Sequence, residues 1–114
     1  MTEYRKSKRA KALYPTKEAK DAVWERDHGR CVWCTLHPER RTGYPAYPEA
    51  HFISRSKSGL GIEQNLLTLC RPHHDEYDHS MRTHREEMKA EFAEYLKSKY
   101  PDWDESELIY RRYQ

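Results

Sequence analysis

Three cysteines and one histidine fall into two pairs with the same short spacing. Cys31 and Cys34 enclose two residues, and so do Cys70 and His73. A two-residue gap turns both side chains of a pair toward one point, and two such pairs supply the four donors of a tetrahedral zinc site. Isolated buried cysteines are common, but they would not need this paired spacing. The sequence therefore predicts a structural Zn²⁺ site, with His74 as the alternative fourth ligand.

The composition explains why the fold would need such a metal. Of the 114 residues, 36% are apolar and 35% are charged, with a mean hydropathy of -1.21. A small polar domain buries little apolar surface to set against its chain entropy. The odd number of cysteines and the lack of a secretory leader argue against disulfides. We therefore expect a bound metal to cross-link the fold.

The charge and hydropathy patterns limit the classes of partner. No apolar run approaches the roughly 18 residues that span a bilayer, so the sequence predicts a soluble, cytoplasmic protein without membrane contact. The formal net charge of +2 is too small to indicate a nucleic-acid partner by itself. Basic side chains nevertheless crowd the N-terminus, where they form either a solvated tail or an arm that contacts phosphates. The candidates for phosphate contact are Arg5, Lys6, Lys8 and Arg9.

Regular elements are expected on both sides of the first metal pair. The apolar spacing predicts a helix that begins near Pro15 and ends by Gly29. The proline-rich residues 35–48 are expected to form a loop. Strands are predicted at 49–53 and 66–70, with a glycine-containing turn between them.

Two helices are expected after the second strand. The first has Pro72 in its first turn and runs through Asp78. The second begins with a capping box formed by Thr83 and Glu86, and it ends before Pro101. Its predicted buried stripe consists of Met88, Phe92, Tyr95 and Leu96. A short helical turn is expected near the C-terminus.

The segment from Glu49 to His74 resembles the catalytic motif of the HNH endonuclease family. In that family a strand carries the first His, a loop carries the central Asn and a helix carries the last His. Here these positions are His51, Asn65 and His74. The flanking cysteine pairs are typical of the zinc-containing members, and the stretch from Gly59 to Asn65 is similar to small HNH proteins of phages.

The resemblance covers about residues 20 to 80 and implies an α+β fold. The core would be a ββα-metal unit (HNH, or His-Me finger) with structural zinc knuckles, spanning residues 16–82 and flanked by N-terminal and C-terminal helices. Residues 1–15 would form a basic arm before this core. Residues 83–114 would form a helical extension packed on it.

The resemblance also implies a metal-dependent endonuclease that hydrolyses DNA phosphodiester bonds. His51, with an ordinary imidazole pKa of about 6.5, is the expected general base. Asn65 is expected to hold that ring through a hydrogen bond. His74 and Asp78 lie one helical turn apart, so they would share a face and bind one catalytic divalent cation, such as Mg²⁺, that stabilises the leaving oxygen. His79 is the alternative ligand on a rotated face.

One position departs from the family pattern. The residue before the general base is commonly a ligand of the catalytic cation, whereas here it is Ala50. Glu49 or bound water can complete the coordination shell instead. If neither does so, the chain is a zinc-containing nucleic-acid-binding module whose site no longer cuts, and this is the alternative function.

DNA is the partner that follows from these assignments. Besides the arm, Arg55 and Lys57 between the two strands are candidates for phosphate contacts. The similarity to phage proteins suggests DNA processing or packaging alongside a phage terminase, in the cytoplasm of a bacterial host.

Overall fold

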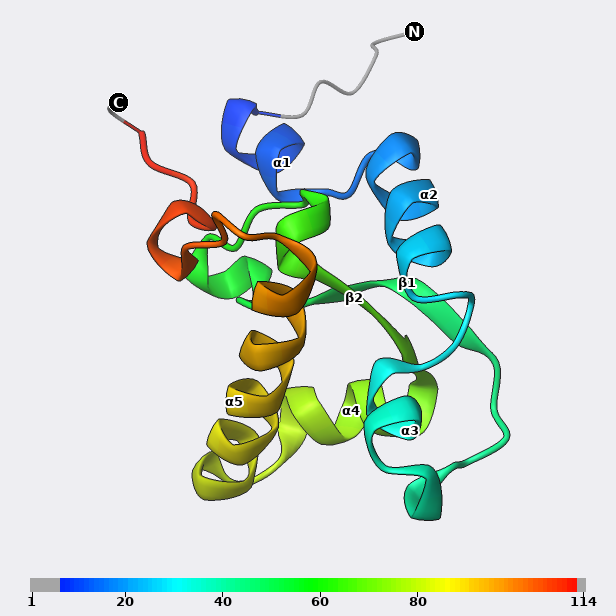
Figure 1. The fold of residues 1–114 in the computed structure, drawn as a ribbon. Helices are drawn as coiled ribbons and strands as arrows, with labels where there is room; N and C mark the ends of the chain where they lie inside the picture. Colours follow the sequence, from blue (N-terminus) through cyan, green and yellow to red (C-terminus); the bar gives the residue numbers. More distant parts are fainter. Residues whose placement is uncertain (1–6, 113–114) are drawn as a thin grey trace, which may run out of the picture.

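The computed structural model describes residues 7–112 and shows an antiparallel pair of strands surrounded by helices (Figure 1). The order is α1 (Lys8–Leu13), α2 (Lys17–Arg26), α3 (Val32–Leu36), β1 (Ala46–His51), β2 (Leu66–Cys70), α4 (Arg71–His79) and α5 (Arg82–Lys99). Short 3₁₀ turns occur at Pro38–Arg40, Arg55–Lys57, Glu63–Asn65 and Glu105–Glu107. The predicted α+β class is confirmed, and the last of these turns is the one expected near the C-terminus.

Strand β1 contains a bulge. Its pairing with β2 shifts by one residue between Tyr47 and Ala50. Pro48 lies in this shift, where the missing N–H of a proline costs no ladder hydrogen bond. The predicted bounds of 49–53 are therefore wrong, and the predicted loop over 35–48 ends earlier, because the bulge admits proline into the strand.

The predicted stripe of α5 forms part of the core. Met88, Phe92 and Leu96 follow one another at four-residue intervals and are fully buried. Tyr95, predicted in the same stripe, is only half-buried, and its hydroxyl donates a hydrogen bond to Asp27. The tyrosine therefore joins α5 to the end of α2 through a hydrogen bond. The other three side chains bury apolar surface in the core.

Helix α5 begins two residues earlier than the sequence predicts, since its N-cap is Met81 rather than Thr83. Met81 precedes the helix, and its side chain makes no capping hydrogen bond. The capping box predicted from Thr83 and Glu86 is wrong, because the Glu86 carboxylate accepts a hydrogen bond from Arg82 Nε at 3.1 Å. The start of this helix is thus set by packing and by the preceding turn rather than by a side-chain cap.

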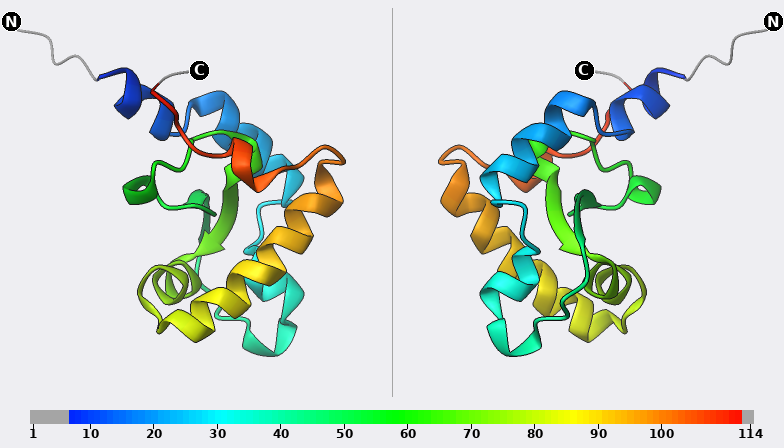
Figure 2. Two further views of the ribbon diagram at one scale, coloured as in Figure 1. Left: turned by 90° about the vertical axis from the view of Figure 1, so that its left-hand side faces the viewer. Right: turned by 90° about the vertical axis from the view of Figure 1, so that its right-hand side faces the viewer.

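Helices α1 and α3 have no counterpart among the predicted elements. Ser7 caps α1 by accepting a hydrogen bond from the Ala10 N–H at 3.1 Å. This helix lies beside the segment that follows α5, and both contact the loop that joins the strands (Figure 2). Within residues 7–112, none of the helices has the length and apolar character that crossing a membrane requires.

Candidate functional site

The two predicted metal-binding pairs meet at one point. The ligand atoms of Cys31, Cys34, Cys70 and His73 all lie within 4.8 Å of one another. His73 Nδ1 is 3.5, 3.4 and 3.3 Å from the sulfur atoms of Cys31, Cys34 and Cys70, in that order. Two of the sulfur atoms, those of Cys34 and Cys70, are 3.9 Å apart. The prediction that these four residues form one cluster is confirmed.

The spacing of the donor atoms fits a tetrahedral metal ion. Zinc bonds of about 2.3 Å to sulfur and about 2.0 Å to nitrogen place two sulfurs about 3.8 Å apart, and a sulfur and a nitrogen about 3.5 Å apart. The distances in the cluster lie close to both values. A set of three sulfurs and one imidazole nitrogen is also the soft donor set that zinc prefers. The cluster is therefore placed to bind a metal ion such as zinc.

Short elements hold the four donors in place. Cys31 immediately precedes α3, and Cys34 lies within that helix. Cys70 ends β2, and His73 lies in the first turn of α4. The Thr42 hydroxyl donates a hydrogen bond to the Cys70 sulfur at 3.2 Å. Such a donor stabilises a thiolate and orients it toward its ion. The cluster thus joins α3, β2 and α4.

Burial changes the proton affinity of two of the four donors. Burial is the main reason that the pKa of the Cys31 thiol is raised to about 12, with added repulsion from the Cys70 and Cys34 sulfurs. Burial also lowers the pKa of His73, so its imidazole is neutral at pH 7, which is the form that binds metals. Buried thiolates need a positive partner, and a bound cation supplies it while releasing the thiol protons.

A second site lies in a large open cleft beside β1. The cleft has a volume of about 1330 Å³, and its walls carry three histidines. Six side chains of Lys or Arg line it against three carboxylates, so the cleft is basic. The basic residues are Lys20, Arg55, Lys57, Arg71, Arg82 and Arg85, and the acidic ones are Glu49, Asp78 and Glu86. A cleft of this charge attracts phosphate groups.

His51 presents a neutral imidazole to the cleft. Its Nε2 lies 2.8 Å from the Leu13 carbonyl oxygen, to which it donates a hydrogen bond. Burial lowers the pKa of His51, and the positive charges of Arg55 and His74 act in the same direction, while the carbonyls of Leu13 and Glu49 oppose the shift. The ring is therefore neutral at pH 7, with one nitrogen able to accept a proton.

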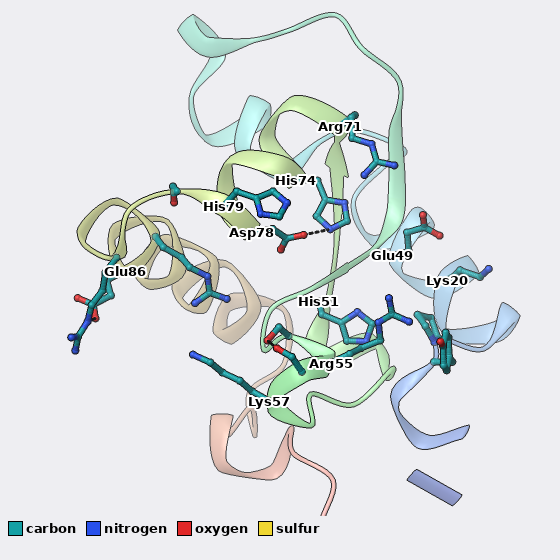
Figure 3. A pocket seen from close by; sticks show the side chains of 17 residues that line it. Lys20, Glu49, His51, Arg55, Lys57, Arg71, His74, Asp78, His79 and Glu86 are labelled. Atoms are coloured by element: carbon teal, nitrogen blue, oxygen red, sulfur yellow. Dashed lines mark hydrogen bonds and ion pairs between the residues drawn. The ribbon is translucent and has the colours of Figure 1, made fainter. Parts of the chain in front are cut away.

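His74 and Asp78 face the cleft from α4. His74 Nε2 and Asp78 Oδ2 are 3.3 Å apart, one helical turn from each other, as the sequence predicts. His79 also lines the cleft. Figure 3 shows His51 across the cleft from His74 and Asp78, so the two predicted halves of the site face one another. His74 is thus separate from the sulfur cluster, and the alternative in which it replaces His73 there is wrong.

Asn65 has a different role from the one predicted. Its side chain is fully buried and makes three hydrogen bonds to the loop between the strands. Oδ1 accepts from the Ile53 N–H at 2.8 Å, while Nδ2 donates to the carbonyls of Ile53 and Leu60 at 3.1 and 2.8 Å. The prediction that Asn65 holds the imidazole of His51 is wrong, because these bonds use the amide to fix the loop backbone.

Glu49 of β1 lines the cleft, whereas the neighbouring Ala50 does not. Ala50 is 1% exposed and lies in the core opposite Leu67. Glu49, by contrast, is exposed and lines the cleft together with His51. The departure noted in the sequence therefore has a structural reason, since the side chain before His51 points into the core.

The predicted phosphate contacts fall into three groups. Arg55 and Lys57 line the cleft. Arg9 does not, because its guanidinium donates to the Arg55 carbonyl at 3.3 Å and to Ser58 Oγ at 3.1 Å. Lys8 is exposed in α1, and within the described chain it does not line the cleft. The remaining two candidates, Arg5 and Lys6, lie outside the described residues.

Four of the cleft's cations were missed by sequence reasoning, and so was a buried ion pair that supports the fold. Lys20, Arg71, Arg82 and Arg85 come from three different helices and share no motif.

The buried ion pair joins Arg26 to Asp27, with Nε to Oδ1 at 2.8 Å and Nη2 to Oδ2 at 2.9 Å. The second carboxylate oxygen also accepts from the Thr68 N–H at 3.0 Å. An adjacent Arg and Asp give no sequence signal of burial, since most such pairs are exposed.

Comparisons with protein-family models, with curated proteins and with solved structures each find no match to this chain.

Proposed function

We propose that this chain is a metal-dependent endonuclease of the HNH type that hydrolyses DNA phosphodiester bonds in the basic cleft. The observation that carries the proposal is the placing of a neutral imidazole, His51, across the cleft from the His74 and Asp78 pair (Figure 3). Phosphodiester hydrolysis requires a base for the attacking water and positive charge at the phosphate. The cleft contains residues of both kinds.

His51 serves as the general base in this proposal. Its Nε2–H is held by the Leu13 carbonyl, so the unprotonated Nδ1 is the atom that accepts a proton from water. The pKa of this ring is lowered mainly by burial, which keeps it available as a base at neutral pH. The proton leaves the cleft when the imidazolium releases it to solvent.

His74 and Asp78 are the residues that would hold a divalent cation such as Mg²⁺. An imidazole nitrogen and a carboxylate oxygen 3.3 Å apart can both reach one ion, and water completes the shell of a hard cation. When bound, the cation supplies Lewis-acid stabilisation of the departing 3′-oxygen. Glu49 adds a further carboxylate on the facing strand.

The sulfur cluster would hold a structural Zn²⁺ ion that orients this site. β1, β2 and α4 follow one another along the chain, which is the order of a ββα-metal core. Cys70 and His73 lie at the junction of β2 and α4, immediately before His74. An ion at that junction fixes where α4 begins, and therefore where His74 and Asp78 face.

The basic rim favours DNA as the substrate. Lys20 comes from α2, Arg55 and Lys57 come from the loop after β1, and the arginines come from α4 and α5, so the basic side chains surround the cleft from several elements. Contacts from such side chains to phosphates are independent of sequence and weaken with salt. The setting of phage DNA processing beside a terminase rests on the family resemblance.

A plasmid assay tests the proposal. Zinc-loaded protein is incubated with supercoiled DNA and either magnesium or manganese, and the nicked form is measured on a gel. We expect nicking by the parent and by His84→Ala, a control whose imidazole contacts Glu76 outside the cleft, but none by His51→Ala.

The same gel separates the two candidate functions. A parent protein that shifts the DNA without nicking it, whichever cation is added, would be the non-cutting zinc module instead. The core-facing side chain of Ala50 is the observation that favours that alternative.

A further inference from the structure

We infer that the segment Ser7–Pro15 is a positioning element for His51 rather than an arm that contacts phosphates. The segment selects which ring nitrogen of His51 carries the proton. The catalytic consequence rests on the proposed function, whereas the structural claim stands on contacts that are independent of it.

The first contact is the hydrogen bond between the ring and the segment. Leu13 is 3% exposed, and its carbonyl oxygen lies 2.8 Å from His51 Nε2. A carbonyl can only accept, so the proton of the neutral ring resides on Nε2. The Glu49 carbonyl also acts on the ring, but the hydrogen bond is the one between Nε2 and Leu13, so Nδ1 keeps its lone pair. The hydrogen bond made by one ring nitrogen fixes the tautomer of an imidazole.

The segment is itself fastened to the loop between the strands. The Gly61 N–H donates to the Ala12 carbonyl at 2.9 Å. Arg9 donates from the same helix to the Arg55 carbonyl and to Ser58 Oγ. These contacts explain why Leu13, at the end of so short a helix, keeps a defined position.

Gly61 shows how closely the two backbones approach. A Cβ atom on this residue would lie 2.5 Å from the Tyr14 carbonyl carbon and 2.6 Å from Pro15 N. Both neighbours are backbone atoms, which cannot turn aside as a side chain can. Any larger residue at position 61 must therefore push the segment away, and the Leu13 carbonyl moves with it.

The segment also orients a cation of the cleft. The Arg55 guanidinium lies over the Tyr14 ring, 4.7 Å from its centroid. The same loop is held from its other side by the C-terminal segment, where the Leu60 N–H donates to the Leu108 carbonyl at 2.8 Å. The loop that carries Arg55 is thus clamped between the first and last elements of the described chain.

The test compares variants of the full, zinc-loaded chain by imidazole ¹⁵N spectroscopy. The ring of His51 is expected to show the Nε2–H tautomer in the parent and in Lys11→Ala, a control on the exposed face of α1. In Gly61→Ala we expect a mixture of both tautomers. Arg9→Ala should shift the ring signals in the same direction by a smaller amount, and Arg9→Lys should restore part of the parent signal.

Zinc content and the near-ultraviolet spectrum establish that each variant is folded. If Gly61→Ala does not fold, Arg9→Ala alone decides the question. Parent-like His51 signals in the folded variants would overturn the inference, because the segment would then have no influence on the ring.

A cleavage assay on the same variants separates this inference from the proposed function. We expect the cleavage rate to fall about tenfold or more in Gly61→Ala, because the base is no longer held in its reactive form, while Lys11→Ala cuts like the parent. If the parent cuts no DNA but its tautomer depends on the segment, the proposed function fails and the positioning role stands. If the parent cuts and Gly61→Ala cuts equally well with an unchanged tautomer, the positioning role fails alone.

Discussion

His74 Nε2 and Asp78 Oδ2 lie 3.3 Å apart on successive turns of α4, and both side chains line the basic cleft. The pair is only partly exposed, with 24% of the His74 side chain and 40% of the Asp78 side chain accessible. An ion entering from the cleft can therefore reach both atoms without any rearrangement of the helix. A cation held by this pair would therefore lie on the α4 wall of the cleft.

Replacing the carboxylate of this pair should weaken the binding of the catalytic cation. Asp78→Asn keeps the size of the side chain and removes its charge, so we expect the manganese concentration for half-maximal cleavage to rise about tenfold or more. Titration of cleavage against manganese gives this value. Asp102→Asn, remote from the cleft, is the control, and an equal response of both variants would show that Asp78 binds no catalytic ion.

Metal removal should unfold much of the domain. Three thiols, two of them buried, and one imidazole meet in a chain that is only 36% apolar, so we expect the ion to contribute a large part of the folding free energy. We expect one zinc per chain by elemental analysis and loss of the cooperative thermal transition after treatment with a strong chelator.

Two substitutions at the cluster separate a ligand from its supporting donor. Cys34→Ser should abolish zinc binding. Thr42→Ala removes the hydrogen bond to the Cys70 sulfur and one accepted from the exposed Tyr44 N–H, but no metal ligand. It should retain zinc with an affinity lower by about tenfold to a hundredfold. A chain that stays fully folded after all metal is removed would contradict the role given to the cluster.

The pH dependence of cleavage should reflect the buried state of His51. Burial lowers the pKa of this ring below its ordinary value, so the neutral base persists below pH 6.5 and is lost only as the pH falls through the lowered value. The unfolded chain binds the proton more readily than the folded chain. The contribution of the neutral His51 to stability is therefore complete above pH 6.5 and declines on acidification.

The measurement is a pH profile of cleavage by folded, zinc-loaded protein, which should have its acid midpoint below 6.5. A midpoint above 6.5 would exclude this ring as the base.

Asn65 should behave as a structural residue. Asn65→Ala removes three buried hydrogen bonds to Ile53 and Leu60 and leaves their backbone groups without these partners. Each such loss costs about 1 to 3 kcal/mol, so the free energy of unfolding in urea should fall by several kcal/mol. Gln64→Ala, at the neighbouring partly exposed position, should change it little. Unchanged stability together with lost cleavage would instead assign Asn65 to the chemistry.

The parts of the site that could be predicted from the sequence are those encoded by local spacing. Cys31 and Cys34 meet the second pair because each pair needs only a short loop to converge. His74 and Asp78 meet because residues four apart share a helix face. In both cases the relevant geometry is set within a few residues, and long-range packing then only has to bring finished units together.

The parts that could not be predicted depend on contacts between distant segments. α1 has only six residues, too few to be stable alone, and the bonds from Arg9 and Ala12 to the loop hold it in place. Pro48 lies in a strand only because the register shifts there. The sequence does not show which groups the Asn65 amide contacts, and in the fold these are backbone groups of Ile53 and Leu60 rather than the His51 ring.

The rate of a single turnover by the parent and by His51→Ala tests the central claim most directly. With a short DNA duplex saturated by zinc-loaded protein, binding no longer limits the reaction, and the rate after addition of manganese reports the cleavage step. The account predicts a rate lower by about a hundredfold or more in His51→Ala, with unchanged zinc content and DNA affinity. Equal rates in the two proteins would contradict it.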